Sequence, residues 1–361
     1  MRTADEPNIH LTSGGIVGEG YSLGLRITDT QEERTVKNLR RSASVLVLFL
    51  CALTIGPTVA SAVTTGPWPI GQDAPYEYLG WGNPEPPVQV MNATGITQFT
   101  LAFMLSDGTC NPAWDGERPL LGGVDEAAIH AIRRHGGDVV VSFGGWSGQK
   151  LGVVCPDAHA LAAAYEKVID TYKLKAIDID IEHTEMYRDP PRRRVAHALG
   201  IVHRDDPGLK IFVTIGTNEN GPDSTGKDLI DRLAAEGVPA DFTIMPFDFG
   251  VPVKNMGRVS IRAAEGLKRD LMAAYNESDT AAYATMGISS MNGVTDEADE
   301  VVTVKDFQEI LAYAQAHHLA RFTFWSVNRD RSCKPGDDAD SCSGIRQATY
   351  AFTKIVAGYH G

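Results

Sequence analysis

The sequence predicts an α/β protein that folds as a (β/α)8 TIM barrel in a single domain. Short apolar runs with β-strand composition alternate with longer segments whose apolar residues recur at helical spacing. The strand candidates start mostly 32–40 residues apart, and eight such units fit residues 63–361. The main alternative is a doubly wound open sheet. That fold usually has fewer strands and often a Gly-rich phosphate loop, and no such loop follows the first strand here.

Eight runs are expected to form the strands, because each is short, apolar and rich in β-branched or aromatic residues. In chain order these runs are Tyr76–Trp81, Gln98–Phe103, Asp138–Phe143, Ala176–Ile181, Lys210–Ile215, Phe242–Met245, Tyr283–Ile288 and Arg321–Trp325.

Helical periodicity predicts the segments between the strands. Leu161, Tyr165 and Val168 illustrate the spacing, and Pro190 suits a helix start because its missing N–H is harmless there. The first unit is weaker, since only the short Pro-rich stretch Pro84–Thr94 joins the first two strands. The helix candidates are Val124–His135, Ala158–Tyr172, Pro190–Asp205, Lys227–Glu236, Ile261–Tyr275, Val304–His318 and a closing helix, Gly344–Ala357.

Residues 1–62 are expected to lie outside the barrel, as an N-terminal extension and a signal peptide. The apolar run from Val45 to Ile55 follows basic residues such as Arg41 and precedes a small-residue site that ends at Ala62. This run is too short to span a bilayer as a helix, and a buried core helix is the alternative interpretation. We therefore expect cleavage after Ala62, secretion of residues 63–361 and no membrane anchor.

The chain is acidic, with 33 Lys and Arg against 46 Asp and Glu and a formal net charge of −13. An acidic surface argues against nucleic acid and anionic membranes as main partners and is compatible with a neutral substrate. We expect a monomer.

Four of the five cysteines remain if Cys51 leaves with the signal peptide. An even number in an exported protein suggests two disulfides, Cys333–Cys342 across a polar loop and Cys110–Cys155 between two loops that follow strands. Free thiols are the alternative. No Cys or His cluster has the spacing of a zinc site, so no metal is expected.

The candidate chemistry lies on the fourth strand, where Asp178, Asp180 and Glu182 alternate with three isoleucines. Because side chains alternate across a strand, the acids face the barrel interior and the isoleucines face the helices. A solvated edge strand and a metal site are alternatives, but one face is wholly aliphatic and Asp248 is the only other obvious acid at a strand end. Acids so close cannot all ionise easily, which favours general acid catalysis. Glu182, last in the row, reaches the face where barrel active sites lie and is the expected proton donor.

This strand resembles the Asp-x-x-Asp-x-Asp-x-Glu signature of glycoside hydrolase family 18, the chitinase family. Three of the four acids match, whereas Lys175 replaces the first Asp and Ala176 replaces the usual Gly. A Ser-x-Gly-Gly motif matches residues 142–145 on strand three. Trp325 lies at the end of strand eight. In the family, a Trp at this position forms the floor of the subsite in which the sugar is cleaved.

One position departs from the family. Strand six carries the family's Met and Asp as Met245 and Asp248, but Phe249 stands where the family has a Tyr. That hydroxyl helps to hold the reacting acetamido group, so its loss implies a slower enzyme or a substitute such as Tyr187 or Tyr283.

The resemblance implies a retaining mechanism in which the substrate's own N-acetyl oxygen replaces a protein nucleophile. It implies Glu182 as the acid and base, Asp180 as the group that orients the acetamide, and Asp178 as its support. It implies chitin or N-acetylglucosamine oligosaccharides as ligands, and neither metal nor organic cofactor. The candidate substrate-binding residues are Trp325, Asp248, Phe249, Met245, Ser142, Gly144, Gly145 and Trp146. Trp81 and Trp114 are further candidates for stacking on sugars.

The short segment between strand seven and its helix leaves no room for the insertion domain that some family members carry, which implies an open groove. Two other functions remain open at this point. One is an endo-β-N-acetylglucosaminidase that acts on N-glycans with the same acids. The other is a chitinase-like lectin that binds chitin with little or no cleavage, although such proteins typically lose the acid that is present here as Glu182.

Overall fold

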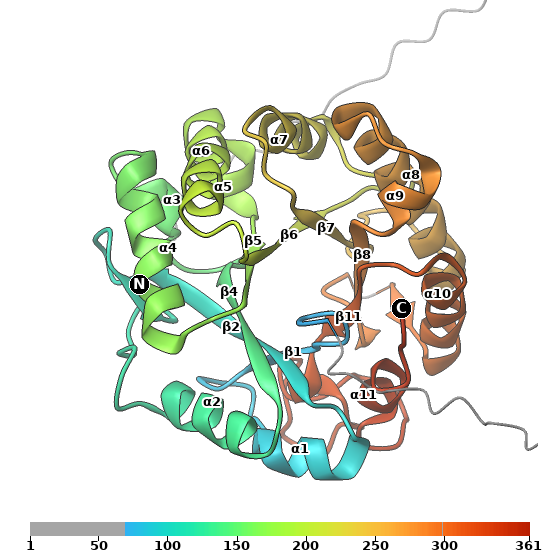
Figure 1. Cartoon of the computed structure of the whole chain (residues 1–361). Coiled ribbons are helices and arrows are strands. Elements are labelled where there is room, and N and C mark those ends of the chain that lie inside the picture. The colour runs from blue at the N-terminus through green and yellow to red at the C-terminus, as the bar shows by residue number, and fades with distance from the viewer. Residues whose placement is uncertain (1–68, 298) are drawn as a thin grey trace, which may run out of the picture. The chain divides into compact units, whose positions relative to one another are not determined.

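The computed structural model describes residues 69–297 and 299–361, and the expected signal peptide and its cleavage site lie outside these residues. Eight parallel strands alternate with helices in a nearly closed barrel, which confirms the predicted (β/α)8 fold (Figure 1). The barrel strands are β1 (Tyr76–Tyr78), β2 (Gln98–Ser106), β4 (Asp138–Gly144), β5 (Ala176–Asp180), β6 (Lys210–Gly216), β7 (Asp241–Met245), β8 (Met286–Met291) and β11 (Arg321–Trp325).

Hydrogen bonds at or next to the first and the last strand in the order, β1 and β11, close the barrel. The ladder runs from β1 through β2, β4, β5, β6, β7 and β8 to β11, with parallel pairing between neighbours. Thr323 Oγ1 on β11 donates to the carbonyl oxygen of Ala74, two residues before β1, at 2.7 Å. Asn328, just after β11, accepts from Tyr78 N at 3.1 Å and donates to Tyr78 O at 2.9 Å. The two end strands are therefore joined largely by side-chain bonds.

The longer helices form a ring around the strands (Figure 1). Their termini carry the expected signals: Asp157 caps α4, and Thr303 with Asp306 forms a capping box at the start of α10. The ring comprises α1 (Pro87–Thr94), α2 (Val124–Arg134), α4 (Ala158–Tyr172), α6 (Asp189–Asp205), α7 (Ser224–Ala235), α8 (Met256–Tyr275), α10 (Val304–His317) and α11 (Ala351–Val356).

Several short helices and strands lie in the loops between the barrel strands and the longer helices. In the segment between β8 and α10, the described residues hold only the hairpin of β9 and β10. The short elements are β3 (Pro112–Trp114), β9 (Gly293–Val294), β10 (Val301–Val302), α3 (Leu151–Val154), α5 (His183–Tyr187), α9 (Asp279–Tyr283) and the 3-10 turn η1 (Val327–Arg329). Among the described residues, no helix has the length and apolar character needed to cross a bilayer.

The alternation on β5 directs its two faces as the sequence predicts. Ile177 and Ile179 are fully buried in the main hydrophobic core between strands and helices. Asp178, between them, bonds to side chains of β1, β4, β6 and β11 inside the barrel. The pleat therefore carries the acids to the barrel axis and the isoleucines to the helices.

Three predicted elements differ from the structure. Tyr283 does not begin a strand, because Ser278 caps a short helix that ends at Tyr283, and β8 starts at Met286. The closing helix spans only Ala351–Val356 rather than Gly344–Ala357. The first unit does contain a helix, α1, which starts at Pro87 and stops at Gly95 in a left-handed conformation.

Both predicted disulfides are present. Cys110 and Cys155 join the loop after β2 to the end of α3, with Cα atoms 4.6 Å apart. Cys333 and Cys342 close the polar loop after β11, with Cα atoms 5.0 Å apart. These distances fall in the normal range for disulfides.

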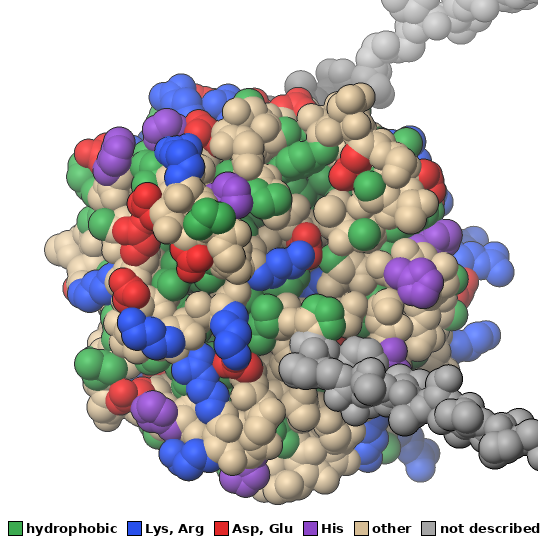
Figure 2. Space-filling model, viewed as in Figure 1, with side chains coloured by type: hydrophobic (Ala, Val, Ile, Leu, Met, Phe, Trp, Pro, Cys, Tyr) green, Lys and Arg blue, Asp and Glu red, His purple; other side chains and the backbone are tan. Residues whose placement is uncertain are grey.

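Charged side chains of both signs are spread over the face shown in Figure 2, between patches of hydrophobic and uncharged side chains. No single sign of charge gathers on that face.

Candidate active site

A cleft of about 910 Å³ opens where the barrel strands end. It is lined by residues that end or directly follow β5, β6, β7, β8 and β11, which is the position of active sites in this fold. The carboxylates of the lining are Asp115, Asp180, Glu182, Asp223, Asp248, Asp296, Glu297 and Asp340. Among the described lining residues there is no Lys or Arg, so the cleft suits a neutral or cationic ligand.

Asp178 lies beneath the cleft and does not line it. Its carboxylate is fully buried and accepts four bonds of 2.6–2.8 Å. The donors are the Tyr76 hydroxyl, the Ser142 hydroxyl, the Thr214 hydroxyl and the Arg321 guanidinium. This arrangement fits the supporting role that the sequence implied for Asp178.

Asp180 is the buried carboxyl at the bottom of the cleft. Its side chain is only 3% exposed, and its Oδ1 has no hydrogen-bond partner among the described residues. Burial raises the pKa of Asp180 well above its usual value, and the nearby carboxylates Glu182 and Asp178 raise it further. An unsatisfied oxygen in such a place is available to a ligand group.

Glu182 follows β5 by two residues and occupies the N-cap position of α5, where its side chain makes no capping hydrogen bond. Its half-buried side chain lines the cleft. Burial raises the pKa of Glu182 to about 7, Asp248 and Asp296 raise it further, and Lys150 opposes the shift. A carboxyl with this pKa holds a proton near neutral pH, which is what a general acid requires.

Stacked aromatic rings form one wall of the cleft. Trp325, at the end of β11, stacks on Phe103 at 5.3 Å and on Tyr78 at 4.8 Å between ring centroids. Trp81 in turn stacks on Tyr78 at 4.3 Å. Trp325 and Trp81 line the cleft, and the rigid stack behind them fixes the plane of the Trp325 indole as a platform for a sugar ring.

Other predicted ligand contacts divide into two groups. Met245, Asp248 and Trp146 line the cleft, and Trp146 is 63% exposed. Phe249 does not line it, because its side chain packs against the hydrophobic core while its amide donates to Glu300 Oε1 at 2.8 Å.

The Ser-x-Gly-Gly motif supports the cleft without lining it. Ser142 is fully buried against Asp178, so its predicted contact with substrate is wrong. Gly144 and Gly145 have positive φ values of 111° and 77°, and a side chain on Gly144 would meet the carbonyl oxygen of Asp180. Gly144 lets β4 pack against the end of β5, Gly145 lies against the Phe103 ring, and neither glycine lines the cleft.

Two further aromatic candidates lie elsewhere. Trp114 is fully buried and donates its indole N–H to the Tyr172 hydroxyl at 2.9 Å, so it is a core residue rather than a sugar platform. Tyr283 bonds to Glu265 and Lys268 on α8 and does not line the cleft. Tyr187 does line it.

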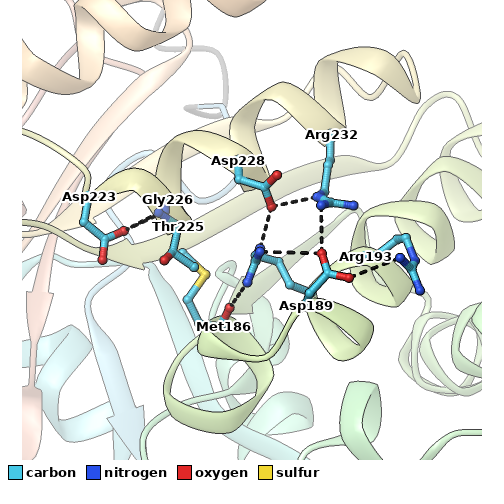
Figure 3. A network of polar contacts seen from close by, with 9 residues as sticks. Met186, Asp189, Arg193, Asp223, Thr225, Gly226, Asp228 and Arg232 are labelled. Carbon is cyan, nitrogen blue, oxygen red and sulfur yellow. Dashed lines mark hydrogen bonds and ion pairs between the residues drawn. The ribbon is translucent and has the colours of Figure 1, made fainter.

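A network of ion pairs and hydrogen bonds between α6 and α7 also binds Met186 of α5 (Figure 3). Arg192 on α6 donates to Met186 O at 2.6 Å and to Asp228 Oδ2 at 2.7 Å. Arg232 on α7 donates to the same Asp228 oxygen at 2.7 Å. Because Met186 lines the cleft, this network holds in place the part of the cleft wall that α5 forms directly after Glu182.

Sequence reasoning did not identify several residues of the site. Arg321 looked like an ordinary strand start, and Lys150 like a loop lysine, but both are buried beside the acids. Among the described residues, no group of three or more His, Cys, Asp or Glu is arranged to hold a metal ion.

No protein-family profile matches the chain. In structure it is similar to active domain 2 of a chitinase from Pyrococcus furiosus, with 31% identity and a TM-score of 0.72. The match covers 82% of this chain and 98% of that domain. The chain belongs to glycoside hydrolase family 18.

More distant proteins share the fold or part of the sequence. A family 18 chitinase from Pseudoalteromonas aurantia shares the fold, with 15% identity and a TM-score of 0.50, over 70% of this chain and 93% of that one. A probable bifunctional chitinase/lysozyme of Escherichia coli is 27% identical over 73% of this chain. This family 18 barrel spans 32% and 48% of the length of the two curated relatives it matches.

Proposed function

We propose that this family 18 barrel is a chitinase that cleaves β-1,4 linkages between N-acetylglucosamine units by a substrate-assisted, retaining mechanism. One observation carries the proposal. Glu182, with a pKa of about 7, lies in the same cleft as Asp180, whose buried Oδ1 has no hydrogen-bond partner among residues 69–297 and 299–361. The family's relatives named above, which are described as chitinases, support the choice of substrate.

In the first step the sugar at the cleavage point rests on Trp325. Glu182 gives its proton to the glycosidic oxygen, and the bond from that oxygen to the anomeric carbon breaks. The carbonyl oxygen of the substrate's own acetamide forms the new bond to the anomeric carbon. Asp180 accepts the acetamide N–H, which orients the acetamide and stabilises the positive charge that develops on it.

In the second step Glu182, now a carboxylate, takes a proton from water. The water oxygen attacks the anomeric carbon, the bond to the acetamide oxygen breaks, and the original configuration is restored. Asp178 keeps its four hydrogen bonds throughout and supports Asp180 from below. Asp248 contributes a hydrogen bond to the bound sugar.

Turnover of a fluorogenic chitotriose substrate by purified residues 63–361 tests the proposal. We expect release of the fluorophore, and reducing-end analysis of natural chitin oligomers should show the retained β configuration in the first product. Binding of chitin oligomers without turnover would indicate a lectin. Release of glycans from a high-mannose glycoprotein, with no action on chitin oligomers, would indicate an endo-β-N-acetylglucosaminidase.

We also propose that the chain is secreted after cleavage following Ala62, on the basis of the sequence of residues 1–62. The two disulfides are consistent with an oxidising environment. The intact mass of the secreted protein tests this proposal. A mature N-terminus far from Val63, or retention in the membrane, would contradict it.

A further inference from the structure

Lys150 is a buried cation that the mechanism above does not use. Its side chain is 2% exposed, in the loop between β4 and α3. Its Nζ donates to Gly144 O at 3.4 Å and to Ser147 O. Among the described residues, no carboxylate oxygen lies within 4.0 Å of Lys150 Nζ, so this lysine forms no ion pair with them. Burying an ammonium group with only neutral acceptors is costly, which calls for a compensating field.

One peptide group connects Lys150 to the acids. The peptide between Gly144 and Gly145 accepts from Lys150 through its carbonyl, and its N–H donates to Asp180 O at 2.8 Å. Gly144 and Asp180 are also register partners in the ladder of β4 and β5. A single peptide group therefore links the Lys150 ammonium group to the backbone of Asp180 at the end of β5, two residues before Glu182.

A third carboxyl group, that of Glu185, lies near Lys150 together with Asp180 and Glu182. Glu185 on α5 is buried and accepts from Gly152 N at 2.7 Å, two residues after Lys150. Burial lowers the pKa of Lys150, and Glu185, Glu182 and Asp180 oppose that shift. In their ionised forms, these three carboxyl groups offset part of the cost of burying the ammonium group.

We propose that Lys150 is a positioning residue whose buried charge sets the pH at which Glu182 gives up its proton; this inference rests on the function proposed above. Lys150 acts through space on Glu182 and through the Gly144–Gly145 peptide on Asp180. It touches neither substrate nor reacting atoms, since it does not line the cleft.

The direction of the effect follows from the groups that surround Glu182. By element, these groups are Lys150 from the loop after β4, Asp180 from β5, Tyr187 from α5, Asp248 from the loop after β7, and Asp296 from the loop between β9 and β10. Lys150 is the one cation among these described neighbours. Removal of its charge leaves the acidic neighbours unopposed and raises the pKa of Glu182.

The test compares pH profiles of kcat/KM on fluorogenic chitotriose for wild type, Lys150→Gln, Lys150→Met and Lys150→Arg. Gln removes the charge but can still donate a hydrogen bond, so it separates the effect of the charge from that of the hydrogen bond. In the Gln and Met variants, the alkaline limb of the kcat/KM profile should move to higher pH by about 1 unit, the lower end of the range for a nearby opposite charge. In the Arg variant, which keeps the charge, the limb should remain at the wild-type position.

Lower rates with the alkaline limb unmoved in both neutral variants would show a merely structural role and overturn the inference. A wild-type chain without turnover would instead contradict the proposed function. In that case, titration of the Glu182 carboxyl by carbon NMR, with the signal identified by its loss in Glu182→Gln, still decides the question. An unchanged Glu182 pKa in Lys150→Gln would overturn the inference, and an upward shift would support it.

Discussion

Arg321 Nη1 lies 2.7 Å from Asp178 Oδ1 in an ion pair of which neither side chain is exposed to solvent. Arg321 begins β11 and Asp178 lies in β5, so the pair crosses the barrel interior. The second nitrogen of Arg321 donates to Thr100 Oγ1 at 2.6 Å. The Asp178 carboxylate is thereby paired with a cation and fixed below the cleft.

Arg321→Met should strongly destabilise the fold, because it leaves the Asp178 carboxylate buried without its counter-ion. Breaking one side of a buried pair typically costs about 3–5 kcal/mol. Urea unfolding measures the loss. Lys175→Met is the matched control, since Lys175 is mostly exposed and pairs with Asp138 at the surface. Its effect should stay below about 1 kcal/mol. Equal effects of the two variants would contradict this account of the interior.

The pKa of Glu182 predicts how stability depends on pH. Its folded-state pKa, about 7, is above the usual 4.5, so folding favours the protonated form. The two states are equally protonated below about pH 4, and the folded state loses stability as pH rises from there through 7. Glu182→Gln should therefore melt at the wild-type temperature near pH 4 and at a higher temperature near pH 8. A lower melting temperature at pH 8 would show that ionised Glu182 stabilises the fold.

Phe249→Tyr should leave kcat within about twofold of wild type. The departure from the family at this position suggested a missing hydroxyl, but Phe249 packs on the core and does not line the cleft. Tyr187, which lines the cleft beside Glu182, is the better source of a hydroxyl. Tyr187→Phe should lower kcat about ten- to hundredfold, the value of one hydrogen bond to a charged group. A large gain in kcat for Phe249→Tyr would reverse this assignment.

Trp325→Ala should weaken binding of chitin oligomers about tenfold or more, because it removes the platform that Phe103 and Tyr78 hold in place. Isothermal calorimetry measures the loss. Trp114→Phe is the control: Trp114 is buried in the core, so its substitution should lower stability and leave oligomer affinity unchanged. If Trp325→Ala binds as tightly as wild type, the ligand does not rest on this wall.

The sequence predicted the parts of the site that depend on local pattern. The alternation on β5 placed Asp178 and Asp180 inside the barrel, and the cysteine positions indicated both disulfides. These features depend on the pleat of one strand or on short loops. The predicted alternation of side chains along β5 needed no knowledge of the neighbouring strands.

The residues that the sequence did not reveal depend on closure of the barrel. Arg321 meets Asp178 across 143 positions of the chain, and Tyr76 meets it across 102. Nothing near Lys150 in the sequence marks it as buried. The same reason explains the errors at Ser142 and Phe249, whose positions in a motif do not state whether they face ligand or core.

Glu182→Gln provides the most direct test of the central claim that Glu182 is the proton donor. The amide keeps the size of the side chain but cannot deliver a proton to the leaving group. Turnover of natural chitin oligomers should fall by about 10²–10⁴-fold, toward the upper end because the leaving alkoxide is poor. Calorimetric affinity for the same oligomers should persist, since Trp325 and Asp180 are unchanged. Hydrolysis at the wild-type rate by Glu182→Gln, with binding intact, would contradict the account.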